Sequence, residues 1–235
     1  MKNLDYNYDS DGFVILRDAI DKNLIMELRS YAADLLKCDV TPSNILKAME
    51  QLENSNKEGF YEFTKIIGET IPAIKIALIP HIFELAKQMT GFQNLHLMGA
   101  AFFNKKAITR LQYDWHQEKS YYPNAEEVIT LWYPWLTPVN DQNGTMVMKK
   151  GGHKMLFDIE RENVTDGLTQ MRINDNDLME FKDVQCNLEI GDIILFSSMS
   201  PHRTGNNQSG IPRTTLLMRY TNAEGKFDSG WTIEK

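Results

Sequence analysis

The sequence predicts an α+β fold in which a mostly helical segment is followed by a double-stranded β-helix, a cupin-like jelly roll. Residues 1–91 carry apolar residues at helical spacing, whereas residues 92–235 hold short, often β-branched apolar segments separated by turn signals such as DQNG and EIGD. Many short strands with such turns are typical of antiparallel sandwiches and barrels, which at 235 residues are commonly one domain. We therefore predict one domain over 1–235, with the helices packed on one outer face of the jelly roll.

The first segment is expected to open with a strand and continue as helices. Residues 12–20, GFVILRDAI, contain the β-branched run of a strand, and Asp21 is a suitable N-cap for the helix that follows. A proline interrupts helical hydrogen bonding, so Pro80 should divide the last helical stretch. Further helices are expected in the segments 42–53, 58–70 and 72–91.

The second segment is expected to hold the strands of the jelly roll. These are the apolar segments 95–103, 128–136, 145–150, 183–190, 192–198 and 213–222. Residues 154–182 are mostly polar, acidic and poorly periodic, which indicates a long insertion between strands. Long loops of this kind are often lids or binding segments.

Charge and composition exclude several classes of partner. The net charge is -7 and no run of Lys or Arg occurs, which disfavours both nucleic acid and an anionic membrane surface. Two cysteines make no disulfide framework, and the opening residues MKNLDYNYDSDG lack the apolar core of a signal peptide. We therefore expect a cytoplasmic protein whose partner is a small-molecule substrate.

The stretch WHQEKSYY places a histidine and a glutamate two residues apart, among aromatic residues. If the stretch is a strand, His116 and Glu118 point to the same side, because side chains alternate between faces with period two. Such a pair is half of a metal site or an ordinary hydrogen-bonded pair. Asp114, two residues earlier, is a competing carboxylate for the same face.

A third residue shifts the interpretation towards a metal. His202 follows the apolar strand DIILF, and two strands that cross a barrel would bring it to the face of His116 and Glu118. Two histidines and one carboxylate form the facial triad of non-haem Fe(II) oxygenases, which leaves three positions open. A 2-oxoacid takes two of these and O2 takes the third. A zinc hydrolase with the same ligands would leave the arginine discussed next unexplained.

A 2-oxoglutarate cosubstrate also needs a cation for its far carboxylate. Arg213 follows His202 by eleven residues, across the turn TGNNQSGIP, which predicts adjacent antiparallel strands. Arginine suits this role because its planar fork binds a carboxylate through two parallel hydrogen bonds. Arg219 shares the same face by parity and is the main competitor. Arg213 is favoured because it lies nearer the His202 end.

These motifs resemble those of the phytanoyl-CoA dioxygenase family of Fe(II)/2-oxoglutarate oxygenases. The matching segments, in order, are DGFVILRDAI, WHQEKSYYP, NGTMVMKKGGHK and GDIILFSSMSPHRTGNNQSGIPRTTLLMRY, which together extend along nearly the whole chain. The resemblance implies a dioxygenase that uses Fe(II), 2-oxoglutarate and O2 and releases succinate and CO2. A small polar metabolite is the expected substrate, and hydroxylation is the expected reaction.

The resemblance also implies roles for individual residues. His116, Glu118 and His202 would bind the iron. The cosubstrate would be held by Arg213 with Thr204, and by Asn104 and Trp132. Tyr121 and Tyr122 would line the substrate side.

Two departures from the family pattern are visible. The usual metal-binding aspartate is Glu118, one methylene longer, and the usual PGSH turn reads KGGH, so that His153 is interpreted as a turn residue. Halogenases of the family replace the carboxylate by a small residue, so Glu118 favours hydroxylation or desaturation. The glutamate also leaves open a catalytically silent jelly-roll protein that binds a ligand.

Overall fold

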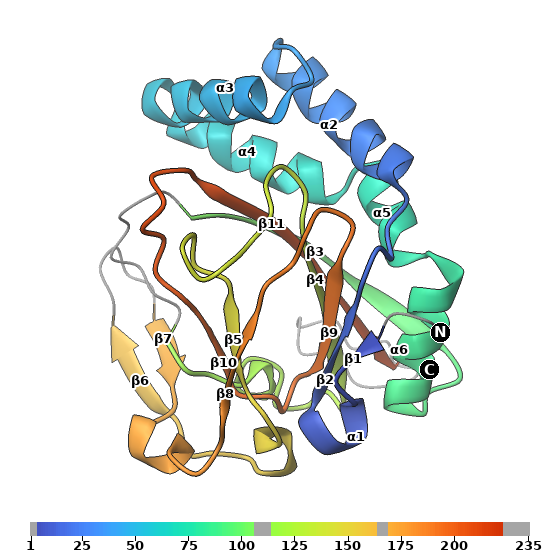
Figure 1. Ribbon diagram of the computed structural model, residues 1–235, viewed down its shortest axis with the longest axis vertical. Coiled ribbons are helices and arrows are strands. Elements are labelled where there is room, and N and C mark those ends of the chain that lie inside the picture. Colours follow the sequence, from blue (N-terminus) through green and yellow to red (C-terminus); the bar gives the residue numbers. More distant parts are fainter. Residues whose placement is uncertain (1–3, 106–113, 164–168, 223–235) are drawn as a thin grey trace.

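The computed structural model describes residues 4–105, 114–163 and 169–222, and its helices precede most of its strands (Figure 1). The helices are α1 (Tyr8–Asp11), α2 (Lys22–Leu36), α3 (Pro42–Ser55), α4 (Lys57–Gly68), α5 (Ile71–Ala77) and α6 (Pro80–Thr90). The strands are β1 (Leu4–Asp5), β2 (Phe13–Leu16), β3 (Leu95–Lys105), β4 (Val128–Pro134), β5 (Met146–Lys149), β6 (Glu160–Asn163), β7 (Thr169–Arg172), β8 (Asp183–Cys186), β9 (Ile193–Ser197), β10 (His202–Thr204) and β11 (Arg213–Asn222).

The expected helix boundaries have a local cause in the sequence. Asp21 caps α2, because its side chain accepts a hydrogen bond from the Asn23 amide at 2.7 Å. Pro80 is the first residue of α6, where a missing amide hydrogen costs nothing. The same helix ends at Gly91, whose φ of 73° is the left-handed conformation that glycine adopts without strain. No helix in the described ranges is long and apolar enough to cross a membrane.

The strands form antiparallel sheets. The larger has six strands in the order β1-β2-β9-β4-β11-β3, and the smaller has three in the order β10-β5-β8. A buried apolar cluster lies between the two sheets, with Trp132, Ile194 and Leu217 from the larger sheet and Met148 and Cys186 from the smaller. The two sheets therefore face one another across a common interior.

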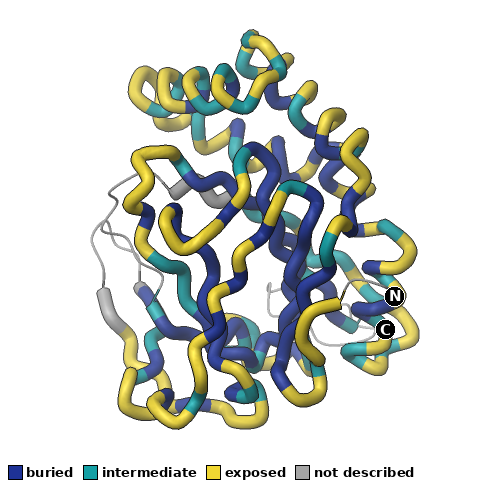
Figure 2. The backbone as a smooth tube through the Cα atoms, in the orientation of Figure 1, coloured by how far each residue is buried: buried dark blue, intermediate teal, exposed yellow. Residues whose placement is uncertain are grey.

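The helices α2 to α6 cover the other face of the larger sheet, along the upper and right-hand sides of Figure 1. Leu216, Met218 and Tyr220 of β11 pack there against buried residues of the helices. Figure 2 shows the result: the strands of the larger sheet are mostly buried, whereas the helices are exposed on their outer sides. Since side chains alternate along a strand, Arg213 and Arg219 share the inner face of β11 with Leu217.

Three local expectations are corrected. Residues 115–122 are not a strand: His116 makes a single bridge, and Glu118–Ser120 form a 3₁₀ turn. The strands β10 and β11 are not adjacent, because the chain between them crosses from the smaller sheet to the larger. The insertion contains a hairpin, β6–β7, which its polar sequence did not predict.

The insertion packs on the outside of the smaller sheet. Its Phe157, Ile173 and Leu178 form a buried cluster with Trp115 and with Val147 of β5. The amide of Ile173 donates to the Trp115 carbonyl at 2.7 Å. The insertion is thereby attached to the chain segment that begins the WHQEKSYY motif.

Candidate metal centre

The two histidines of the predicted triad lie opposite one another. The amide of each donates to the carbonyl of the other, His116 to His202 and back, both at 3.0 Å. This bridge joins the 114–117 segment to the free edge of β10, whose other edge pairs with β5. The ring centroids are 4.2 Å apart, and both residues are buried.

Backbone carbonyls fix the orientation of both rings. The Nδ1 atom of His116 lies 2.7 Å from the Asp114 carbonyl, and that of His202 lies 2.9 Å from the Ser200 carbonyl. A carbonyl only accepts, so each Nδ1 carries the hydrogen and each Nε2 offers a lone pair to the cluster. Burial, followed by the neighbouring His116, lowers the pKa of His202 to about 3, which keeps the ring in the neutral form that binds metals.

Glu118 completes the cluster at the start of the 3₁₀ turn. Its Oε1 atom lies 3.9 Å from Nε2 of His116 and 3.7 Å from Nε2 of His202. One ligand atom from each of the three residues lies within 4.8 Å of the others, and all three residues are buried. Burial alone would raise the pKa of Glu118, but the Arg219 guanidinium outweighs it and holds this pKa below its usual value.

Neighbouring residues hold the turn in place. Gln117 is fully buried, and its amide nitrogen donates to the carbonyls of Met155 and Met199. Its amide oxygen accepts from the Phe157 amide at 3.1 Å. The Lys119 amide donates to the Ser198 carbonyl at 2.9 Å. Glu118 therefore reaches the histidines from a turn whose neighbouring residues are held by hydrogen bonds on both sides, rather than from a strand.

Arg219 binds the other oxygen of Glu118. Its Nε and Nη2 atoms donate to Oε2 at 3.1 and 2.9 Å. The guanidinium carbon also lies 5.4 Å from the ring centroid of Tyr122, within the range of a cation–π contact. Sequence parity placed Arg219 on the correct face, but it did not predict this partner.

Arg213 lies at the opposite end of the inner face of β11. It is buried, its Nη1 atom donates to the Gly144 carbonyl, and its Nε atom has no hydrogen-bond partner within the described residues. Its guanidinium carbon lies 5.7 Å from the ring centroid of Trp132. No carboxylate of the described residues pairs with it, and burial lowers its pKa to about 10, at which it remains charged at neutral pH.

The other predicted cosubstrate residues lie on three different strands. Thr204 follows His202 by two residues on β10 and so shares its face, while Trp132 is buried on the inner face of β4. The backbone of Asn104 pairs with Thr214, but its side chain lies outside the described part of the chain.

The two predicted substrate tyrosines have different partners: Tyr121 contacts His116 of the cluster, and Tyr122 contacts Arg219. The Tyr121 ring meets the His116 ring edge to face, with centroids 6.0 Å apart. The Tyr121 hydroxyl accepts a hydrogen bond from the Met171 amide of β7 at 3.3 Å. Tyr121 thus links the cluster to the insertion.

The competing residues lie elsewhere. Asp114 forms an ion pair with Arg172 at 3.0 Å and is not part of the cluster. His153 packs against the ring of Tyr8, with centroids 6.3 Å apart, and is likewise outside it.

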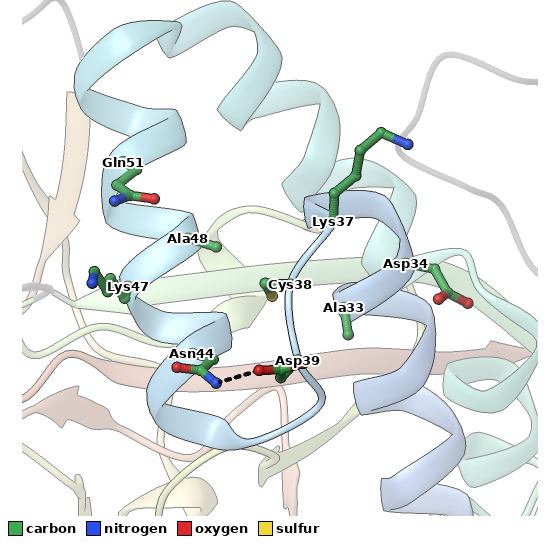
Figure 3. A pocket seen from close by; sticks show the side chains of 9 residues that line it. All are labelled: Ala33, Asp34, Lys37, Cys38, Asp39, Asn44, Lys47, Ala48 and Gln51. Carbon is green, nitrogen blue, oxygen red and sulfur yellow. Dashed lines mark hydrogen bonds between the residues drawn. The ribbon is translucent and has the colours of Figure 1, made fainter.

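A groove of about 610 Å³ lies between α2 and α3, away from these residues. Its walls carry the charged side chains of Asp34, Lys37 and Lys47, and Figure 3 shows Lys37 extending away from the others. Asn44 donates to Asp39 at 3.2 Å, so these two polar groups satisfy one another. None of the lining residues belongs to the metal cluster, which therefore remains the candidate site.

A family model described as phytanoyl-CoA dioxygenase (PhyH) matches residues 8–215. The chain belongs to the phytanoyl-CoA dioxygenase family. The match extends over the three cluster residues and Arg213, and it ends before Arg219. No curated protein sequence is significantly similar to the chain.

Several solved structures are similar to the chain in fold. The epimerase SnoN, solved with Fe3+, alpha ketoglutarate and nogalamycin RO, has a TM-score of 0.66 and 16% identity, over 94% of this chain and 82% of its own. EctD from S. alaskensis, solved with 2-oxoglutarate and 5-hydroxyectoine, has a TM-score of 0.64 and 14% identity, over 94% and 76%. The monooxygenase ThoJ has a TM-score of 0.66 and 18% identity, over 94% and 77%. At these identities the likeness shows the fold alone.

Proposed function

We propose that the protein is an Fe(II)- and 2-oxoglutarate-dependent dioxygenase that hydroxylates a small polar metabolite and releases succinate and CO2. The observation that carries this proposal is the buried cluster, in which Glu118 Oε1 lies 3.9 and 3.7 Å from the Nε2 atoms of two histidines. In a member of the phytanoyl-CoA dioxygenase family, this donor set is the expected facial triad.

The donor set fits iron. Two neutral imidazole nitrogens and one carboxylate oxygen favour a divalent metal with open positions, whereas a structural zinc is usually closed by four protein ligands. When bound, the iron and 2-oxoglutarate would activate O2, which is the oxidant. The protein residues hold the donors: the His116–His202 bridge aligns the rings, and the turn after Gln117 presents Glu118.

The far end of the interior fits a carboxylate. Arg213 is a buried cation without an acidic partner in the described residues, and its Nε–H has no acceptor there. A buried charge is costly unless it is paired, so a bound dicarboxylate would supply the missing partner. We assign Arg213 and Thr204 to the C5 carboxylate of 2-oxoglutarate, and Trp132 and Asn104 to further contacts with this cosubstrate.

The substrate is assigned to the side of Tyr121 and Tyr122. The Tyr121 ring contacts His116, the Tyr122 ring contacts Arg219 beside the cluster, and Tyr121 also contacts the insertion. The structures of SnoN and EctD contain small organic molecules, which agrees in kind with a small metabolite. Glu118 occupies the position that a halogenase leaves open, and this supports hydroxylation or desaturation over halogenation. We further propose that residues 1–235 form one jelly-roll domain with its helices on one face, in the cytoplasm.

The test is visible absorption of the protein under argon. Adding Fe(II) and 2-oxoglutarate should give a weak charge-transfer band, because the 2-oxoacid chelates through its C1 carboxylate and ketone. His202→Ala should abolish the band, whereas His81→Ala, at an exposed position in α6, should retain it. A full-strength band in His202→Ala would overturn the ligand assignment. Admitting O2 and measuring succinate then separates a dioxygenase from a catalytically silent binding protein.

A further inference from the structure

The two oxygens of Glu118 have different partners. Both hydrogen bonds from Arg219 end on Oε2, at 3.1 and 2.9 Å. Oε1 is the oxygen that faces the Nε2 atoms of the two histidines. One oxygen of the carboxylate thus binds an arginine, and the other faces the candidate metal position.

Arg219 is itself held in place. It lies on β11, where its backbone is paired with Thr130 of β4. The ring of Tyr122 lies 5.4 Å from its guanidinium carbon. Side-chain exposure is 17% for Arg219 and 8% for Glu118, so little water competes for their hydrogen bonds. Charge-assisted bonds of this kind are about twice as strong as neutral ones.

The length of the Glu118 side chain explains why the contact with Arg219 matters. Compared with an aspartate, Glu118 has one more rotatable bond, so its carboxylate can turn more freely. A carboxylate binds a metal through one oxygen or through both. If both oxygens bound, Oε2 would take one of the three open positions of a facial triad. A 2-oxoacid chelate that needs this position would first have to displace Oε2, and O2 needs a third position.

We infer that Arg219 reserves Oε2 of Glu118, so that the glutamate offers a metal only Oε1 and three positions stay open. This inference rests on the proposed iron site. Arg219 is therefore a positioning residue: it acts through Glu118 and makes H-x-E behave like the shorter H-x-D.

The expected direction of the change in metal affinity distinguishes this role from simple support of the ligand. Removing a cation beside a metal site favours metal binding by Coulomb's law, and a freed Oε2 adds a second donor. A variant without Arg219 should therefore keep or gain metal affinity and lose cosubstrate affinity. An arginine that merely held Glu118 in place would show the reverse, because its loss would weaken the metal first.

The experiment uses the full chain loaded with Mn(II), which reports through electron paramagnetic resonance and water proton relaxation. In Arg219→Met, Mn(II) affinity should stay within threefold of the wild type or become tighter. The relaxivity from coordinated water should fall by about a third, as three open positions become two. The affinity for 2-oxoglutarate should fall at least tenfold.

The matched control is Arg203→Met. Arg203 is next to His202 on β10, but its guanidinium lies over the Trp115 ring at 4.6 Å, on the outer face of the sheet. This variant should retain both affinities and the relaxivity. Arg219→Lys retains the charge but lacks the planar fork, and it should give a smaller loss of 2-oxoglutarate affinity. It also serves if Arg219→Met fails to fold, which circular dichroism would reveal.

Two results would overturn the inference. One is that both the relaxivity and the affinity for 2-oxoglutarate stay at the wild-type value in both Arg219 variants. The other is Mn(II) binding weakened tenfold with the cosubstrate affinity retained. A wild-type protein that bound neither Mn(II) nor 2-oxoglutarate would instead contradict the proposed function itself, so the two failures are distinguishable.

Discussion

The inner face of β11 carries an arginine near each end, and their surroundings are opposite. Arg219 binds Glu118 through two hydrogen bonds and lies against the metal cluster. Arg213 is buried without a carboxylate partner in the described residues. A protein gains stability from the first arrangement more readily than from the second, because an unpaired buried charge is costly.

The difference separates two uses of the same residue type. A paired arginine is available to orient another side chain, and an unpaired buried one is available to a ligand that brings its own charge. Residues that break a local rule of stability are expected at functional sites. On this argument Arg213 belongs to the cosubstrate and Arg219 belongs to the metal ligand.

The largest effect is expected at Glu118, the carboxylate that Arg219 binds. Glu118→Gln keeps the shape of the side chain but removes its charge. Fe(II) affinity, measured anaerobically by calorimetry, should fall by more than the roughly 10–100-fold that loss of a residue behind a metal ligand costs. Succinate formation should fall with it.

The matched control for this variant is Asp114→Asn. Asp114 is two residues before His116 but is paired with Arg172 at 3.0 Å, so its neutralisation should leave Fe(II) affinity unchanged. The Fe(II) affinity of Glu118→Asp should lie between those of Glu118→Gln and Asp114→Asn. Its side chain keeps the charge but is too short to reach both Arg219 and the metal position. Wild-type affinity in Glu118→Gln would remove Glu118 from the triad.

The second effect concerns the unpaired arginine. Arg213→Ala should weaken 2-oxoglutarate binding by roughly 30-fold or more, since loss of one partner of a buried charge pair costs about 2–5 kcal/mol. Iron affinity should change little, because Arg213 has no contact with the cluster in the structure described. Calorimetry with the metal-loaded protein measures both constants.

A ligand control sharpens the distinction between the arginines. A 2-oxoacid without the second carboxylate should bind Arg213→Ala and the wild type equally, whereas Arg219→Met should bind it more weakly. A larger loss of 2-oxoglutarate affinity in Arg219→Met than in Arg213→Ala would reverse our assignment. In the absence of ligand, Arg213→Met should unfold at a temperature no lower than the wild type, because it removes an unpaired buried charge.

Much of the fold could be predicted because its signals are local. Asp21, Pro80 and Gly91 mark helix ends wherever the rest of the chain lies, and the apolar strands are bounded by turn residues. The hairpin β6–β7 was missed because it is polar and its pairing is its main signal. The change of sheet between β10 and β11 also depends on distant strands, which no local pattern records.

In the candidate site, too, local signals could be predicted from the sequence and contacts between distant segments could not. The sequence selected the three residues that the structure brings together, although the strand expected for residues 115–122 is a bridge followed by a turn. Chemical type and order along the chain were sufficient for that. The contact between Arg219 and Glu118 joins residues 101 apart and depends on how the turn sits against β11, so sequence parity alone could not reveal it.

A smaller effect is expected where the backbone supports Arg213. Gly144, whose carbonyl accepts from Arg213, has a φ of 84°, and a Cβ there would lie 2.4 Å from the Gly205 carbonyl oxygen. Gly144→Ala should therefore lower the free energy of unfolding by at least about 2 kcal/mol, from strain and steric overlap together. Urea denaturation measures this.

The matched control is Gly210→Ala. Gly210 has a similar φ of 74°, but nothing lies within 4 Å of a Cβ there, so only the conformational cost of about 1 kcal/mol applies. If the two variants were equally stable, the close approach of the 144 and 205 segments would not be a feature of the folded protein.

The smallest effect is expected at Tyr121, which connects the cluster to the insertion. Tyr121→Phe keeps the ring against His116 and removes only the hydroxyl that accepts from the Met171 amide at 3.3 Å. At that length the bond is weak, so the free energy of unfolding should fall by at most about 1 kcal/mol. Affinities for Fe(II) and 2-oxoglutarate should not change, because the hydroxyl points to the insertion rather than to the metal ligands. Hydrogen exchange should quicken at the Met171 amide while the amides of His116 and His202, which bond to one another's carbonyls, exchange as before. Faster exchange at the histidines as well would mean that the insertion supports the metal centre, and Tyr121 would then belong with Arg219 among the residues that position its ligands.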